Sequence, residues 1–356
     1  MKALAITNKG LESISALEIK ELIGKKCKIG ETVVSFEANE NEICRLCYLG
    51  RSFIKVIELL DEFDFKTKED ILKNSGIKID AKTFVVRCQR EGSHDFTSQE
   101  ISEEVGEVIL NNNKVKVELE NPEKIVFVYI CDNKCYIGID YAGIDLSKRE
   151  YKIFSHPASV RGNIAYSLIR IADYSRKKVL LDPFCKSGEI CIEAALSACG
   201  LSQNFYNKKK FAFLKFAEFD FEKEDKKAKL DEKVEIFCFD TIGANLKAAE
   251  KNAKIAGINK KINFSRIDTD WLDVKVKEKS VDCIVSILPD FKEERIAEKN
   301  YKEFFYQAKY VLKIDGVAVL LCKKPGIVKK AGDLKLVEEI EIMSGKQKLA
   351  VLKYNA

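Results

Sequence analysis

The first stretch of the chain alternates between strand-like and helix-like patterns of apolar residues. Residues 3–7 alternate as in a half-buried strand, and apolar positions in residues 11–24 recur near helical spacing up to a glycine stop. A second strand-like segment covers residues 31–38, and a second helical one covers residues 39–50. This order of strand, helix, strand and helix is typical of small α+β modules, so we expect such a module at residues 1–60.

A second α+β region is predicted at residues 61–155. Residues 84–92 form a strand-like run, and an amphipathic helix follows in which Ser98 can serve as the N-cap. Residues 114–143 then alternate as strands, broken by turn signals that include an Asn-Pro pair ending at Pro122. We therefore treat this region as a module of its own.

Residues 156–356 repeat strand and helix patterns and are predicted to form an α/β domain. Five short, apolar and β-branched segments are strand candidates, at residues 178–184, 233–240, 261–268, 281–289 and 316–324. Helical patterns lie between most of them, most clearly at residues 188–200 and 243–257. This alternation predicts a doubly wound parallel sheet with its ligand at the carboxyl ends of the strands. The lysine-rich run between Asn204 and Lys233 is expected to be a solvated insertion.

Composition narrows the class of protein. With 356 residues, 46% of them hydrophobic, the chain is large enough for two or three domains with hydrophobic cores. We expect no membrane span and no signal peptide, because no long apolar stretch occurs inside the chain or near its N-terminus. Twelve unevenly spaced cysteines are then expected to be reduced thiols in the cytoplasm. The formal charge of +5 is compatible with a polyanionic partner but does not require one.

Metal chemistry is poorly supplied by this sequence. His94 and His156 are the two histidines of the chain, so we expect neither a metal site nor a histidine-based nucleophile. Cys44 and Cys47 form a CxxC pair, but they fall at core spacing in a predicted helix. We interpret these two thiols as buried core residues.

Carboxylates end the first three predicted strands of the α/β region. They are Asp182, Asp240 and Asp268. A carboxylate can accept hydrogen bonds from both ribose hydroxyls or from an adenine amino group, so the row suits a nucleoside. Any one of them could instead be a helix cap or a turn residue, but three in sequence favour a binding site. The first loop lacks the GxGxxG spacing of dinucleotide enzymes, and a small cationic nucleoside such as S-adenosylmethionine fits better.

Several segments resemble parts of one protein family. DPFCKSGEICIEAAL resembles the first motif of Rossmann-fold RNA methyltransferases, and HPASVRGNIAYSLIRIA is similar to the helix that closes their cofactor site. FVVRCQREGSHDFTSQEISEEVGEVI and KVELENPEKIVFVYICDNKCYIGIDYAGIDLSKREYK are similar to the THUMP RNA-binding domain. The first region resembles the ferredoxin-like module that precedes THUMP in the guanine-N2 methyltransferases. The resemblance thus covers nearly the whole chain in the family's domain order.

The resemblance implies a fold, a reaction and a cofactor site. The fold would be a C-terminal, doubly wound Rossmann-like domain behind α+β ferredoxin-like and THUMP modules. The reaction would be methylation of the exocyclic N2 amine of a guanosine in tRNA, with S-adenosylmethionine as cofactor. Similarity places Asp182 beside the methionine end of the cofactor, Asp240 on the ribose and Asp268 near the adenine. The full set of implied cofactor-binding residues is Asp182, Phe184, Lys186, Gly188, Asp240, Asp268 and Thr269.

The resemblance also implies an RNA surface. THUMP and ferredoxin-like modules together grip the acceptor-stem end of tRNA, and the candidates for phosphate contact here are Arg87, Arg90, Lys148 and Arg149. Phosphate contacts would explain affinity and reach rather than the choice of base. For each residue an ordinary surface ion pair is the alternative. The oligomeric state stays open.

The fourth strand end departs from the family pattern of Asn or Asp, Pro, Pro and an aromatic residue. That motif accepts hydrogen bonds from the target amine and stacks on the flipped base. Here the aligned residues begin at Ile287, whose side chain cannot accept a hydrogen bond. The catalytic candidates are Leu288, through its backbone carbonyl, Pro289, Asp290 and Phe291, the last two supplying a carboxylate and a ring one step late.

A second departure lies in the first motif, where Lys186 replaces the usual glycine. Its long side chain either obstructs the close approach of backbone and cofactor or pairs with the cofactor's carboxylate. The two departures leave open an alternative function, a noncatalytic RNA-binding protein with a degenerate catalytic motif. A methyltransferase acting on a small molecule is disfavoured by the THUMP-like module.

Overall fold

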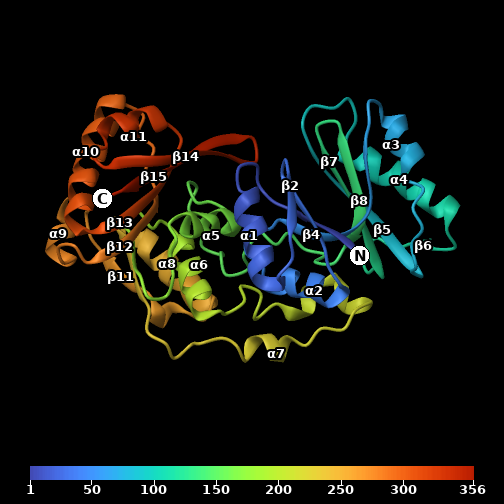
Figure 1. Cartoon of the computed structure of the whole chain (residues 1–356), viewed down its shortest axis with the longest axis horizontal. Helices are drawn as coiled ribbons and strands as arrows, with labels where there is room; N and C mark the ends of the chain where they lie inside the picture. The colour runs from blue at the N-terminus through green and yellow to red at the C-terminus, as the bar shows by residue number, and fades with distance from the viewer. The chain divides into compact units, whose positions relative to one another are not determined.

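The computed structural model describes residues 1–356 and divides into two compact units (Figure 1). Unit 1 consists of Met1–Thr7, Ser15–Leu146 and Asn207–Phe221. Unit 2 consists of Asn8–Ile14, Ser147–Tyr206 and Glu222–Ala356. No helix in the structure is long and apolar enough to cross a membrane. All twelve cysteines are free thiols, as the sequence predicts.

Unit 1 is built on one eight-stranded sheet with the strand order β2-β3-β1-β4-β8-β7-β5-β6. Its strands are β1 (Lys2–Ile6), β2 (Cys27–Gly30), β3 (Val33–Glu37), β4 (Lys55–Asp64), β5 (Thr83–Glu91), β6 (Lys116–Val117), β7 (Lys124–Cys131) and β8 (Lys134–Asp140). Its helices are α1 (Glu12–Ile23), which begins in unit 2, α2 (Glu40–Leu49), α3 (Lys68–Asn74) and α4 (Ser98–Asn112), with short 3-10 turns η1 (Lys208–Lys210) and η2 (Ala212–Lys215).

Strand β4 joins the two regions that the sequence separates at residue 60. It pairs antiparallel with β1, where Ala3 faces Glu58, and antiparallel with β8, where Leu59 faces Gly138. A strand that is paired along both edges belongs to the interior of a sheet. The two regions that resemble ferredoxin-like and THUMP modules therefore share one sheet and one compact unit.

The N-cap of helix α4 lies one residue earlier than predicted. The N-cap is Thr97, whose hydroxyl accepts a hydrogen bond from the Glu100 amide at 3.2 Å, while the Glu100 carboxylate accepts the Thr97 amide at 2.7 Å. This reciprocal capping box needs an acidic residue three positions after the N-cap, and Glu100 lies three positions after Thr97. Ser98 is the first helical residue. In α2, Cys44 and Cys47 are fully buried, as predicted.

The lysine-rich insertion is not simply solvated, contrary to prediction. Residues 207–221, called the arm below, lie between two elements of unit 2 in sequence but pack in unit 1. The Phe213 side chain is fully buried, and its ring stacks on that of Phe211 with centroids 5.0 Å apart. The Phe213 amide donates to the Tyr141 carbonyl at 3.0 Å. Five phenylalanines among the lysines supply the apolar surface that holds the arm in the core of unit 1.

Unit 2 is a three-layer α/β unit on a seven-stranded sheet with the order β11-β10-β9-β12-β13-β15-β14. Its strands are β9 (Val179–Asp182), β10 (Glu235–Asp240), β11 (Asn263–Arg266), β12 (Val281–Ile287), β13 (Leu312–Cys322), β14 (Lys335–Ser344) and β15 (Gln347–Asn355). Its helices are α5 (Gly162–Ile171), α6 (Glu189–Cys199), α7 (Phe221–Asp225), α8 (Gly243–Ile255), α9 (Leu272–Lys275), α10 (Glu294–Val311) and α11 (Pro325–Ala331), with η3 (Asn259–Lys261) and η4 (Thr269–Trp271).

The five predicted strands are confirmed as β9 to β13, and they are parallel to one another. The hairpin of β14 and β15, which pairs antiparallel with β13, was not predicted. Helices α5, α6 and α8 bury the core of one face, and α10 and α11 bury the other. Strands β9, β10 and β11 follow one another outward across the sheet, and β12 then pairs with the other edge of β9. The order of the strands reverses there, and ligands of doubly wound sheets bind at such a switch point.

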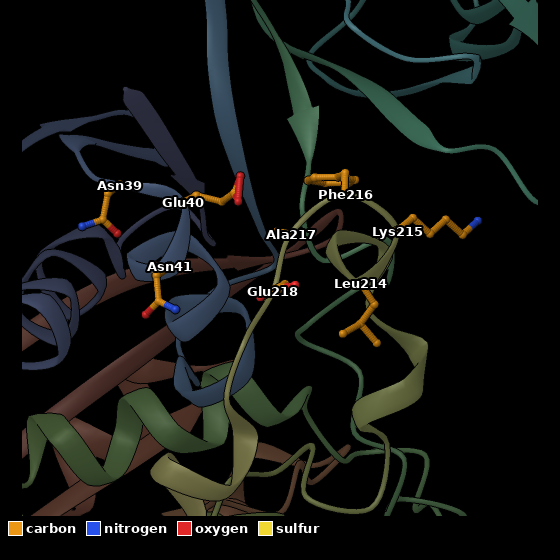
Figure 2. Close-up of a pocket in the computed structure, with 8 residues that line it drawn as sticks. All are labelled: Asn39, Glu40, Asn41, Leu214, Lys215, Phe216, Ala217 and Glu218. Atoms are coloured by element: carbon orange, nitrogen blue, oxygen red, sulfur yellow. The ribbon is translucent and has the colours of Figure 1, made fainter.

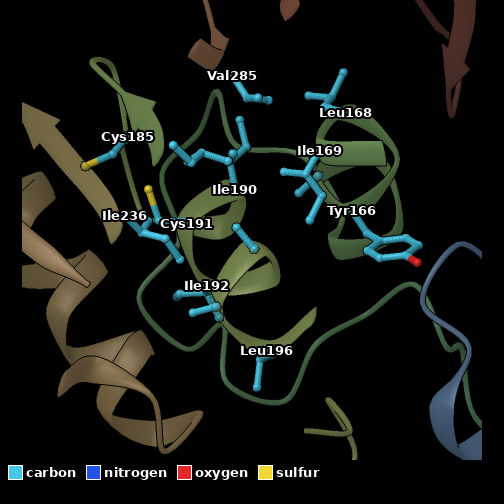
Figure 3. Packing of buried hydrophobic residues seen from close by; sticks show 14 of the residues in the cluster. Tyr166, Leu168, Ile169, Cys185, Ile190, Cys191, Ile192, Leu196, Ile236 and Val285 are labelled. Atoms are coloured by element: carbon cyan, nitrogen blue, oxygen red, sulfur yellow. The ribbon is translucent and has the colours of Figure 1, made fainter. Parts of the chain in front are cut away.

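Helix α6 is fixed directly behind this switch point. Figure 3 shows Ile190, Ile192 and Leu196 of α6 packed among buried residues of α5 and the sheet. The preceding Gly188 has a φ of +85°, and a Cβ atom there would lie 2.8 Å from the Ala249 Cβ. Glycine is therefore required for both the turn and the close approach of α8.

The arm yields a stability prediction. Replacing Phe213 by Ala should lower the free energy of unfolding of unit 1 by about 3–5 kcal/mol, because it removes a fully buried ring from a packed aromatic cluster. Urea denaturation monitored in unit 1 measures the loss. Leu214→Ala is the matched control, since Leu214 is 42% exposed and its truncation should change little. Equal effects of the two substitutions would show that the arm is not part of the core.

Candidate active site at the switch point of unit 2

Two of the predicted carboxylates and the end of β12 meet at the switch point. Asp182 is the last residue of β9, Asp240 of β10 and Ile287 of β12. Parallel pairing aligns Leu180 of β9 with Cys283 of β12. Because the carboxyl ends of parallel strands share one edge of a sheet, the three strand ends open onto the same crevice.

Asp182 is a buried acid with a strongly perturbed protonation equilibrium. Its side chain accepts a hydrogen bond from the Ser286 hydroxyl at 2.5 Å and from the Phe184 amide at 3.2 Å. Burial raises the pKa of Asp182 to about 7, although the Ser286 hydrogen bond and the nearby Lys186 favour the charged form. The carboxyl group therefore titrates near neutral pH, which is typical of a functional site.

Asp240 organises the first loop as well as facing the crevice. Its Oδ2 accepts the backbone amide of Lys186 at 2.9 Å, and its Oδ1 accepts the Ile242 amide at 2.9 Å and the Asn245 side chain at 3.1 Å. A carboxylate offers about four acceptor positions, so capacity for one ligand hydroxyl remains. Asp240 thus ties the loop after β9 to the end of β10.

Lys186 crosses the switch point. Its backbone has a φ of +52°, in the left-handed region, and the residue is 6% exposed. Its Nζ donates a hydrogen bond to the carbonyl oxygen of Ile287. Burial lowers the pKa of Lys186, against the opposing influence of Asp182 and Glu189. The two departures from the family motifs are therefore in direct contact, which the sequence did not reveal.

The segment after β12 is held firmly by its own contacts. The Leu288 amide donates to the Leu321 carbonyl at 2.9 Å, which continues the pairing with β13. The Tyr301 hydroxyl donates to the Pro289 carbonyl at 2.6 Å. The Phe291 ring packs edge-on against Tyr301 with centroids 5.7 Å apart. These contacts give the catalytic candidates a defined backbone path.

Asp290, the fourth catalytic candidate, is partly exposed and paired. Its carboxylate lies 3.3 Å from the Lys323 Nζ and 3.4 Å from the Lys324 Nζ. Both lysines directly follow β13, and Lys324 also donates to the Phe291 carbonyl at 2.8 Å. Two lysine ammonium groups therefore flank the Asp290 carboxylate.

The segment before α5 lies on the first loop, where the resemblance places a closing element. The His156 amide donates to the Ser187 hydroxyl at 3.1 Å. Asn252 of α8 donates to the Ser187 carbonyl at 3.0 Å and to the Phe154 carbonyl at 2.9 Å. Asn252 was not predicted as a site residue. The available signal was its place in the predicted helix, three residues after Ala249 and next to Ala253, since an amide on the buried face needs partners.

The third carboxylate lies at the open edge of the row. Asp268 caps η4, where it accepts the Asp270 amide at 3.3 Å and the Thr269 hydroxyl at 3.5 Å. It lines a pocket of about 510 Å³ together with Arg266 and Trp271, whose side chain is 64% exposed. A planar ring can bind at this end of the row, because the exposed Trp271 ring lies in the same pocket as the Asp268 carboxylate, a hydrogen-bond acceptor.

The phosphate candidates do not form one group. Arg87 is exposed on β5, whereas Arg90, three residues further, projects from the opposite face of the strand and lies 3.4 Å from the His94 ring nitrogen. Lys148 is exposed in unit 2. Strand periodicity thus separates the two arginines that the sequence grouped together.

Arg149 is a correction to the predicted RNA surface. Its side chain is buried, and its Nε donates to the Glu193 carboxylate at 2.7 Å. The Tyr151 hydroxyl donates to the same carboxylate at 2.8 Å. A buried guanidinium committed to a buried acid cannot also neutralise a phosphate. Arg149 therefore stabilises unit 2, and the prediction that it contacts RNA is wrong.

A larger pocket, of about 790 Å³, lies in unit 1 (Figure 2). The first turn of α2, with Asn39 and Glu40, forms one side, and residues 214–218 of the arm form the other. Asn39 already caps α2, accepting the Glu42 amide at 2.9 Å. The pocket follows from the packing of the arm, and its lining lacks the cluster of buried, perturbed groups found at the switch point.

Asp182 yields a prediction of pH dependence. A carboxyl group whose pKa rises on folding binds more protons in the folded state between about pH 4 and pH 7, so its contribution to stability falls as the pH rises through that window. Asp182→Asn should remove this slope and gain up to about 4 kcal/mol relative to the wild type at pH 8. Denaturation curves at several pH values measure it. Parallel profiles for the two proteins would contradict the raised pKa.

Three models of protein families match consecutive parts of the chain. The RlmL ferredoxin-like domain matches residues 2–57, the THUMP domain matches residues 63–140, and the RMKL-like methyltransferase domain matches residues 149–353. The order agrees with the sequence prediction, and the third match covers more than half of the chain.

Curated relatives share this arrangement. A tRNA (guanine(6)-N2)-methyltransferase of Methanocaldococcus jannaschii is 30% identical over 94% of this chain and 95% of its own length. A protein of the same name from Archaeoglobus fulgidus is 30% identical over 73% of this chain and 67% of its own. Ribosomal RNA large subunit methyltransferase K/L of Aliivibrio fischeri is 30% identical over 74% of this chain, which spans 40% of that longer protein.

Solved structures share the fold. TrmN from Thermus thermophilus is similar with a TM-score of 0.75 and 23% identity, and 99% of each chain is covered. SMU.472, described as a methyltransferase and complexed with SAH, has a TM-score of 0.84 and 19% identity over 100% of this chain and 98% of its own. The α/β class and the domain order predicted from the sequence are confirmed.

Proposed function

Because the chain belongs to the RMKL-like methyltransferase family and carries RlmL ferredoxin-like and THUMP domains, we propose that it is an S-adenosylmethionine-dependent tRNA methyltransferase acting on the N2 amine of a guanosine. One observation carries the proposal. The relative from M. jannaschii, named a tRNA (guanine(6)-N2)-methyltransferase, matches this chain over nearly the full length of both proteins. The buried Asp182 at the switch point, whose pKa is raised, supports it from the structure.

The residues at the strand ends fit S-adenosylmethionine, which supplies an electrophilic methyl group on a sulfonium. Asp182 offers a buried carboxylate to a cationic group, and Asp240 keeps acceptor capacity for a ribose hydroxyl. Asp268, beside the exposed Trp271, offers an acceptor to an adenine amine. Phe184, Gly188 and Thr269 flank these acids and complete the proposed set.

The reacting amine of guanine is a weak nucleophile, because its lone pair is delocalised into the ring. Transfer then depends on positioning and on exclusion of water. The segment of Leu288 and Pro289 is suited to this, since Leu288 is 5% exposed and both residues are held by backbone hydrogen bonds. Phe291 would stack on the guanine base. Asp290 would orient the N2 amine of the guanine, or the side chains of Lys323 and Lys324.

Exposed cations of each unit would hold the RNA. Arg87 on β5 and Lys148 are exposed cations that can contact phosphates, and Arg90 contributes from the other face of the strand. The proposed grip on the acceptor-stem end rests on the THUMP domain and on these cations.

One observation favours a second candidate function, a noncatalytic RNA-binding protein. The side chain of Ile287 supplies no acceptor, and Lys186 reaches into the crevice. The two functions differ in affinity for the cofactor and in turnover, so one assay separates them.

The direct test is methyl transfer. Purified protein incubated with unmodified tRNA and radiolabelled S-adenosylmethionine should label the RNA, and nucleoside chromatography should identify the product as N2-methylguanosine. Asp182→Ala should abolish cofactor binding and leave tRNA affinity unchanged, since Asp182 lies among the strand ends of unit 2. Tight tRNA binding without label transfer or cofactor affinity would select the noncatalytic function.

The RNA surface makes a separate prediction. Arg87→Ala and Lys148→Ala should each weaken tRNA binding about equally for all sequences and reduce the slope of log affinity against log salt by about 0.7–0.9. Lys335→Ala, an exposed lysine on β14, is the matched control and should leave the slope unchanged. Titrations at several salt concentrations measure it. A slope unaffected by both substitutions would place the RNA elsewhere.

A further inference from the structure

A polar side chain from another element reaches the last residue of β12. Ile287 is apolar, and the hydrogen bond from Lys186 Nζ to its carbonyl brings an amine to this point from the loop after β9. The Lys186 side chain thus links the loop after β9 to the end of β12, the two strands at which the strand order reverses. Lys186 thus brings its amine to the residue at which the family motif has an Asn or Asp.

The amine is held but not saturated. Its one hydrogen bond within the protein goes to the Ile287 carbonyl, and the residue is 6% exposed. A neutral amine has two N–H groups and a lone pair, so a bond to Ile287 leaves the lone pair available. Buried polar groups normally find partners, and a ligand in the crevice can supply one to this lone pair.

We propose that Lys186 is a catalytic residue that substitutes for the missing side chain at position 287 by accepting the proton of the target amine. The inference rests on the proposed function. It accounts for two departures, a lysine for a glycine and an isoleucine for an Asn or Asp, by a single contact between them.

The step balances as follows. The lone pair of the guanine N2 attacks the methyl carbon, a nitrogen–carbon bond forms, and the sulfur–carbon bond breaks with its electron pair going to sulfur. The N2 atom becomes cationic and loses one proton to Lys186 Nζ, which becomes an ammonium while keeping its bond to Ile287. The ammonium then returns the proton to water when the product leaves.

The charge environment permits a neutral amine at rest. Burial lowers the pKa of Lys186 despite the groups that face it, which are Asp182, Cys185, Glu189 and Asp240. Three of these are offset. The pKa of Asp182 is itself raised to about 7. The Asp240 carboxylate accepts hydrogen bonds from backbone amides, and the Glu189 carboxylate lies 3.0 Å from the Lys152 Nζ. Buried lysines commonly serve as bases for this reason.

Three variants isolate the role. Lys186→Arg keeps a cation and N–H donors but has no lone pair to accept a proton. Lys186→Gly removes the amine and suits the φ of +52°, so it should fold. Lys186→Gly combined with Ile287→Asn restores the family pattern at both positions. Circular dichroism and calorimetric affinity for S-adenosylhomocysteine control for folding and for an intact cofactor site.

The expected result is a loss and a recovery. Lys186→Arg and Lys186→Gly should each lower kcat about 100-fold or more, with cofactor affinity within a few-fold of wild type. The double variant should recover to within about tenfold. The wild-type kcat should rise with pH as Lys186 deprotonates, and this limb should vanish in the double variant. NMR of [15N]lysine-labelled protein should show one Nζ, absent from Lys186→Arg, that deprotonates below the others.

Other outcomes overturn the inference, and they differ from failure of the proposed function. Full activity of Lys186→Arg, or an Nζ that stays charged up to pH 10, would refute a proton acceptor. A large loss of cofactor affinity in Lys186→Gly would show that Lys186 binds the cofactor instead. An active double variant beside an inactive wild type would show that Lys186 blocks the site. No transfer by either protein, with cofactor bound by both, would refute the proposed function itself.

Discussion

The pairing of β12 with β9 is the constraint on which the site depends. It brings Ser286 within 2.5 Å of Asp182 and places the end of β12 beside the loop that carries Lys186. A doubly wound sheet must leave a crevice where its strand order reverses, because the connecting helices lie on opposite faces there. Every buried group with a perturbed protonation equilibrium in the proposed reaction lines this crevice. The rest of unit 2 holds the two strands in register.

The crevice contains more charge than its burial would normally allow. Two acids and a lysine share a region that is nearly closed to water, and burial pushes Asp182 and Lys186 toward their neutral forms. Neutral forms of an acid and an amine can exchange protons near physiological pH, whereas fully charged forms would be locked together. The proposed role of Lys186 as a proton acceptor depends on this environment.

Unit 1 shows a different kind of constraint. Strand β4 crosses the boundary between the ferredoxin-like and THUMP regions and is paired on both edges, so the two regions share one hydrogen-bonded sheet. The arm also belongs to this unit, since a segment that interrupts the methyltransferase sequence buries Phe213 in the core of unit 1. An insertion that reads as lysine-rich is thus also an aromatic anchor.

The sequence alone determined the α/β class, the domain order, the five parallel strands and the row of acids at their ends, because periodicity and strand-end residues are local properties. It also marked Lys186 and Ile287 as departures. Only the tertiary structure showed that these two touch, that Arg149 is buried against Glu193, and that the arm belongs to unit 1. Each of these is a contact between residues distant in sequence, and composition and spacing carry no information on which distant side chains will meet.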